Sequence, residues 1–180
     1  NKASELAKKF LQGGSKDLLK SLGFILEKND NFTQFLKFSD KKRALAVLLD
    51  SDISPDASNS DFANQSPVSY GLSITSQENL PYLIIQSGGM LRIYPTDSSK
   101  GVGRRGRTET YLEINTNVLS DSEAAYLWLI FSGEALKSKG SLNDLIEKSH
   151  RFGSELAKGL RNRVYNQVVP DLARGIAQAK

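Results

Sequence analysis

The stretch YLIIQSGGMLRIY, residues 82–94, predicts two β-strands joined by a tight turn at Gly88 and Gly89. Both halves are rich in apolar and β-branched residues, and a glycine pair is typical of a two-residue hairpin turn. The stretch GVGRRGR follows at residues 101–107, and TYLEI at residues 110–114 predicts a third strand. The sequence therefore places a glycine- and arginine-rich loop between two strands of a sheet.

Other segments extend this hairpin into a larger fold. The run ALAVLL, residues 44–49, is continuously apolar and bounded by charged residues, which predicts a central strand buried on both faces. Residues 51–66 are rich in Ser, Asp, Asn and Pro and predict a loop, after which Pro67 can begin a helix over residues 67–75. The fold class that we expect is α/β, with α+β possible: a small mixed sheet flanked by helices.

Helices are predicted at both ends of the chain, over residues 3–11, 16–22, 123–131 and 141–169. In the third of these, Tyr126, Trp128, Leu129 and Phe131 are expected mostly in the core. For the last helix, we expect a capping box from Ser141 to Asp144 and an end or kink at Pro170. Its residues at helical spacing form one stripe: Leu142, Leu145, Ile146, Ser149, Phe152, Leu156, Leu160, Val164 and Val168.

The composition excludes several classes of function. The 180 residues are 39% hydrophobic and 24% charged, as in an ordinary globular protein, and no apolar run approaches the roughly 20 residues that span a bilayer. The absence of cysteine excludes disulfides and thiolate metal sites and fits a cytoplasmic location, and a single histidine, His150, removes most zinc and triad chemistry. Because the chain begins at Asn1, we interpret it as a piece of a longer polypeptide, with processing of a short leader as the alternative.

The glycine- and arginine-rich loop is a candidate contact for DNA phosphates. Lys100, Arg104, Arg105 and Arg107 can each neutralise one phosphate, and the glycines let the backbone approach closely. The G-x-G-x-x-G pattern at residues 101–106 does not predict a dinucleotide site, because a strand and not a helix is expected after it. The alternatives are a solvated hairpin tip and a loop docked on another domain.

The long C-terminal helix carries a second set of cations. Arg161 and Arg163 are candidate DNA contacts that would follow the backbone together with the loop. The alternative is a solvated face, which is the usual environment of charged residues on a long helix. The other cations of this helix are Lys148, Arg151, Lys158 and Arg174.

Asp50 and Asp52 close the central strand and are the weak candidates for a catalytic or metal site. Carboxylates two residues apart point to the same side of a strand, where they can hold Mg²⁺ and activate water for phosphodiester cleavage. No lysine follows at the next position. The alternative is a strand end that runs into a solvated loop.

Two segments carry a resemblance to a known family. Residues 81–95 with 108–114, together with the helix LIEKSHRF from residue 145 and its continuation through Leu156, Leu160, Arg161, Val164 and Tyr165, resemble the N-terminal region of large bacterial restriction–modification polypeptides. These are type IIG enzymes, or methylases with an Eco57I-like adenine methyltransferase. The similarity covers about half of the chain, roughly residues 80–169.

The resemblance implies a PD-(D/E)XK nuclease-like domain, here residues 1–136, in front of a methyltransferase, with residues 141–180 as a helical connector. In that fold the strand before the loop and helix carries an acid-x-lysine pair, where this chain has Asp50 and Asp52. The family thus predicts a degenerate, non-catalytic module that contacts DNA or the methylase domain, with S-adenosylmethionine bound only by the missing downstream domain. An active Mg²⁺-dependent endonuclease and a purely structural interdomain module are the alternatives.

Overall fold

The computed structural model describes residues 15–97, 107–120 and 122–178. Its centre is a six-stranded mixed sheet in which the strands lie side by side in chain order. The strands are β1 (Ile25–Lys28), β2 (Thr33–Phe38), β3 (Lys41–Leu49), β4 (Tyr82–Ser87), β5 (Met90–Pro95) and β6 (Leu112–Asn115). The prediction of a mixed α/β fold with helices flanking a small sheet is confirmed, including the hairpin of residues 82–94.

One pair of neighbouring strands in the sheet is parallel, and the other four pairs are antiparallel. β1, β2 and β3 form an antiparallel meander, β4 runs parallel to β3, and β5 and β6 continue antiparallel. The β2–β3 turn is made by Ser39 and Asp40, both with positive φ, at 49° and 59°, as tight hairpin turns require. Parallel pairing needs a longer crossover, which here runs through the loop after β3 and helix α3 (Pro67–Gln77).

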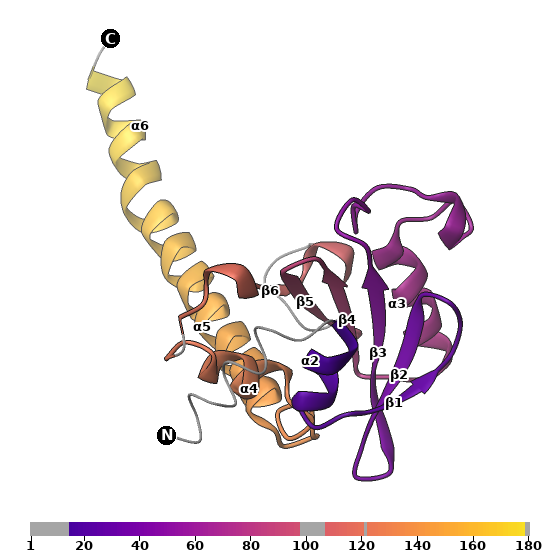
Figure 1. The fold of residues 1–180 in the computed structure, drawn as a ribbon. Helices are drawn as coiled ribbons and strands as arrows, with labels where there is room; N and C mark the ends of the chain where they lie inside the picture. Colours follow the sequence, from indigo (N-terminus) through magenta and orange to yellow (C-terminus); the bar gives the residue numbers. More distant parts are fainter. Residues whose placement is uncertain (1–14, 98–106, 121, 179–180) are drawn as a thin grey trace.

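Helices cover both faces of the sheet and give three layers (Figure 1). Helix α3 packs on one face with a core that includes Leu45, Val47 and Leu83. Helices α2 (Ser15–Ser21), α4 (Ala125–Phe131) and the start of α5 (Ser141–Arg163) pack on the other face. β3 is buried on both faces as predicted, because alternate residues of the strand belong to the two cores.

The approach of α3 to the sheet depends on Gly71. A Cβ atom at this position would lie 2.6 Å from Leu83 Cδ1 and 3.0 Å from Val47 Cγ2. Only glycine therefore lets the helix backbone come this close to β3 and β4, which fixes the parallel pair at the centre of the molecule.

The prediction that Tyr126 and Trp128 lie in the core is wrong. Their exposed fractions are 56% and 44%, whereas Leu127 and Phe131 of the same helix are fully buried. Residues four apart share a face of a helix, so the short α4 turns one face to the core and exposes the side chains on either side of it.

The capping box predicted at Ser141 is also absent. Gly140 is the N-cap residue and makes no side-chain cap, and Ser141 Oγ donates instead to the carbonyl oxygen of Leu129 at 2.5 Å. Asp144 pairs with Lys148 at 2.7 Å. The helix is thus attached at its start by Leu142, which is fully buried in the core on this face of the sheet.

Pro170 does not end the long helix. A π-helical turn at Val164–Val168 joins α5 to α6 (Val169–Gln178), and the N–H of Val169 bonds to the carbonyl oxygen of Val164, five residues earlier. A proline inside an α-helix removes one hydrogen bond, and its ring clashes with the carbonyl four residues earlier, which the wider turn relieves. The helix projects well beyond the sheet (Figure 1). Among the described residues, no helix is long and apolar enough to cross a membrane.

Candidate functional site

Asp50 and Asp52, the candidate catalytic or metal residues, follow directly after β3, which ends at Leu49. The chain turns immediately after Leu49: Asp50 accepts a backbone hydrogen bond from Ile53 at 3.1 Å, and residues 51 and 52 lie in a turn. Carboxylates two residues apart share a side only where the backbone is extended, and the strand does not continue through residues 51 and 52. Both residues are exposed, and the described part of the chain contains no group of three or more metal-ligating side chains.

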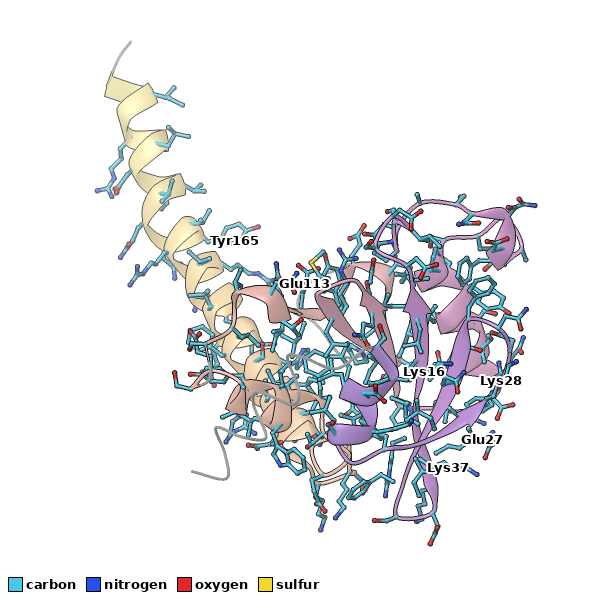
Figure 2. The ribbon with its side chains drawn as sticks, in the orientation of Figure 1. Lys16, Glu27, Lys28, Lys37, Glu113 and Tyr165 are labelled. Atoms are coloured by element: carbon cyan, nitrogen blue, oxygen red, sulfur yellow. The ribbon has the colours of Figure 1, made fainter. Side chains whose placement is uncertain are left out.

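Asp50 instead lies beside the first turn of α2. A hollow of about 350 Å³ is lined by both segments, with Lys16 and Asp17 on the helix side and Leu48, Leu49 and Asp50 on the strand side. Figure 2 shows Lys16 on this helix, in front of the sheet. Sequence reasoning missed Lys16 and Asp17 because they lie more than 30 positions before Asp50 and belong to no motif.

The best-defined polar cluster is centred on Arg92 of β5, which is only 9% exposed. Its Nη1 donates to Asp56 Oδ2 at 2.8 Å, and its Nε donates to Glu113 Oε2 at 2.5 Å. Nη1 also donates to the hydroxyl of Tyr94 at 3.3 Å, and the ring of Tyr111 lies 4.6 Å from the guanidinium. The cluster therefore joins the loop after β3 to β5 and β6.

The electrostatics of this cluster favour a fixed cation. Burial by itself lowers the pKa of Arg92, but the hydrogen bonds that it donates to Asp56, Tyr94 and Glu113 outweigh burial and raise it. Burial raises the pKa of Tyr94 to about 12, with the neighbouring guanidinium acting in the opposite direction. Neither group can exchange a proton near neutral pH, so the cluster has the properties of a structural clamp and not of an acid–base pair.

The clamp lies where the glycine- and arginine-rich loop is anchored. Lys100, Arg104 and Arg105 fall outside the described residues, and of the side chain of Arg107 nothing is described. The two described ends of the loop are placed: β5 ends at Pro95, and a 3₁₀ turn, η2 (Arg107–Glu109), leads back to β6. The segment after Gly106 is therefore a 3₁₀ turn that leads to a strand. A dinucleotide-binding glycine loop would need an α-helix at this point, so the structure agrees with the prediction that this pattern is not such a loop.

Two hollows flank this anchor. One, of about 410 Å³, lies between the β5–β6 edge and α5, and the other, of about 560 Å³, lies toward the start of α3. Glu109 and Tyr111 line both of them. His150 lines the first from the side of α5. The described ends of the loop thus lie between α3 and α5, next to the strands and the loop that the ion pairs of Arg92 connect.

Arg161 and Arg163, the two candidate DNA contacts on the C-terminal helix, lie on different sides of it. Arg161 and Arg163 are both exposed, and two residues correspond to a rotation of about 200° around the helix axis, so the two side chains leave the helix on nearly opposite sides. Lys148 is paired with Asp144, and Arg174 with Asp171 at 2.6 Å. Residues 141–163 contain five basic and three acidic side chains, so the charges on this segment are largely interleaved.

Comparison with known proteins adds no further information: no protein-family model, no curated protein and no solved structure matches this chain. The functional argument therefore depends on the residues and on their geometry.

Proposed function

We propose that this chain is a non-catalytic, nuclease-like N-terminal module of a restriction–modification DNA methylase. It contacts the DNA backbone through the loop of Lys100, Arg104, Arg105 and Arg107, and the helix from Ser141 onward leads to the methylase domain. S-adenosylmethionine would be bound by that downstream domain.

The observation that carries this proposal is the end of β3. The resemblance requires a central strand, followed by a loop and a helix, that presents an acid-x-lysine pair. β3 has the required sequence context, since it is followed by the loop, α3 and the parallel strand β4. It ends at Leu49, and a turn follows at residues 51 and 52, with exposed carboxylates and without the lysine. The arrangement fits a nuclease-like domain that has lost the group needed to stabilise charge on the attacked phosphate.

DNA contact by the loop is supported by where the loop is anchored. Its described ends lie at the sheet edge, and the single positive charge of Arg92 offsets one of the two negative charges of Asp56 and Glu113 beside them. These two carboxylates therefore repel an approaching phosphate less than free carboxylates would. On the C-terminal helix, by contrast, Lys148 and Arg174 are already paired.

The test is DNA binding across a salt series, measured by fluorescence anisotropy with a short labelled duplex. Replacing Arg104, Arg105 and Arg107 with alanine is expected to weaken binding and to lower the salt dependence by roughly three phosphate contacts. The matched control replaces Lys148, Arg151 and Lys158 with alanine, which removes the same charge from the mixed face of α5. Equal effects of the two triple variants would show that net charge alone drives binding and would refute the role of the loop.

One observation favours a second candidate, an active Mg²⁺-dependent endonuclease. The hollow beside Asp50 brings in Asp17 and Lys16, which supply a second carboxylate and the missing amine from another element. This reading predicts Mg²⁺-dependent nicking of plasmid DNA that is lost in Asp50→Asn and retained in Asp61→Asn, an exposed carboxylate elsewhere. If neither DNA binding nor nicking occurs, the third alternative, a purely structural interdomain module, accounts for the chain.

A further inference from the structure

The C-terminal helix exposes an apolar face far larger than its contact with the domain. Beyond residue 150, nine large apolar side chains are between 45% and 68% exposed. Seven recur every four residues, namely Phe152, Leu156, Leu160, Val164, Val168, Leu172 and Ile176, and two more, Tyr165 and Val169, follow directly after members of this row. We call these nine residues the apolar row. Figure 2 shows Tyr165 standing off the projecting part of the helix.

The π-turn keeps the two halves of the apolar row on one side of the helix. A step of four residues overshoots a full α-helical turn by about 40°, so the six steps from Phe152 to Ile176 would wind the row through roughly 240°. The wider turn at Val164–Val168 takes up about one extra residue, close to 100°, and leaves roughly 140°. The bulge therefore turns a winding row into a broad face.

Seven members of the apolar row are arranged symmetrically about Val164. Leu160 is as far from Val164 as Val168, Leu156 as Leu172, and Phe152 as Ile176, whereas the counterparts of Tyr165 and Val169 are Arg163 and Gly159. A two-fold dimer interface must be complementary to itself, so that each residue meets the symmetry mate of its counterpart. Two copies of this helix aligned antiparallel about Val164 satisfy this condition at the seven symmetric positions.

We propose that this face is a dimer interface, and that two copies of the chain pair antiparallel through α5 and α6 about Val164. The nine large apolar side chains, each roughly half exposed, present on the order of 800 Å² of accessible surface in each copy. This equals the area per partner that a specific protein–protein interface buries. The opposite face of the helix is polar, with Lys158, Asn162 and Asn166 pointing to solvent. This assembly does not depend on the proposed DNA-binding function.

The antiparallel arrangement also fits the shape of the molecule. The domain lies at the beginning of α5, and the helix projects away from it toward its C-terminal end (Figure 1). In an antiparallel pair centred on Val164, the partner's Gln178 would reach the level of His150, where the helix leaves the domain. The two domains would then lie at opposite ends of the helix pair.

The first test is the oligomeric state of the chain, measured by light scattering and sedimentation over a concentration range. The chain is expected to dimerise, and Leu160→Glu should weaken the dimer at least a hundredfold because it places a charge at the centre of the apolar face. Asn162→Glu adds the same charge two residues away on the polar face and should leave the dimer unchanged. Since Leu160 is 56% exposed in the single chain, circular dichroism of the variant should show an intact fold.

The second test is the orientation, for which the absence of native cysteine is useful. Val164→Cys should form a disulfide-linked dimer with itself, because its symmetry mate lies opposite to it. Phe152→Cys should not link to itself, since the two copies would be separated by roughly 36 Å along the pair, but it should link to Ile176→Cys when the two variants are mixed. A chain that stays monomeric at about 100 µM, a dimer that tolerates Leu160→Glu, or self-linked Phe152→Cys would each overturn the proposal.

Discussion

Replacing Arg92 with methionine removes the cation that joins the loop after β3 to β5 and β6, while keeping a side chain long enough to pack against Tyr111. In the native chain this guanidinium makes ion pairs with Asp56 at 2.8 Å and with Glu113 at 2.5 Å. Hydrogen bonds to charged groups contribute about 1.5–3 kcal/mol each, and breaking a fully buried ion pair costs about 3–5 kcal/mol.

The two carboxylates are not equally buried, which lowers the expected cost. The side chain of Arg92 is 11% exposed, but that of Asp56 is 57% exposed and that of Glu113 is 34% exposed. Once freed, both carboxylates can be hydrated, so we expect Arg92→Met to lower the free energy of unfolding by about 2–3 kcal/mol.

Urea unfolding followed by circular dichroism measures this loss directly. With a slope of about 2 kcal/mol per molar urea, the midpoint should fall by about 1–1.5 M. The matched control is Lys148→Met, which breaks the exposed pair with Asp144 and should cost less than about 0.5 kcal/mol. Adding Glu113→Gln to Arg92→Met should recover part of the loss, because one unpaired carboxylate is removed. A cost for Arg92→Met no larger than that of the control would refute the view that this cluster holds the sheet edge together.

Three further changes test the packing and the electrostatics of the domain. Gly71→Ala should destabilise the fold by about 1–3 kcal/mol, because its Cβ would lie 2.6 Å from Leu83. Gly159→Ala should instead stabilise α5 by about 0.5–1 kcal/mol, because a Cβ there meets nothing within 4 Å. Equal shifts in the melting temperatures of the two variants would contradict this difference. Because the pKa of Tyr94 is raised to about 12, the stability that its neutral form provides should be complete below pH 10 and lost as the pH rises through 12; urea midpoints of Tyr94→Phe should lack this decline. Burial alone would raise the pKa of Asp30, but hydrogen bonds from two backbone N–H groups and a tyrosine hydroxyl outweigh it and lower the pKa. Asp30→Asn should therefore lower the free energy of unfolding by about 1–2 kcal/mol at pH 7, and this loss should shrink as the pH falls below about 4. A pH-independent cost would contradict that assignment.

The sequence was a good guide where a local pattern determines the outcome. The continuous apolar run of residues 44–49 predicts a strand buried on both faces, and β3 is such a strand. The glycine pair at residues 88–89 predicts the hairpin turn between β4 and β5. In both cases the periodicity of a few adjacent residues contains the whole signal.

It was a poor guide where the outcome depends on contacts that are distant in the chain. Tyr126 is aromatic, a property that favours burial. It is nevertheless exposed, because the short helix α4 buries only the face with Leu127 and Phe131. Pro170 was expected to end or kink the long helix, but the helix continues past it through a π-turn. The hollow that joins Asp17 to Asp50 follows from the packing of α2 on the sheet, which no motif encodes.

The central claim is that this domain holds DNA without cutting it, and one sample can test both halves. A fluorescein-labelled duplex is incubated with the chain and Mg²⁺, its anisotropy is followed across a salt series, and the same DNA is then run on a denaturing gel. The account predicts binding that weakens steeply with salt, depends on Arg104, Arg105 and Arg107, and leaves the DNA intact. Cleavage that disappears in Asp50→Asn, or no binding at about 50 mM salt, would contradict it.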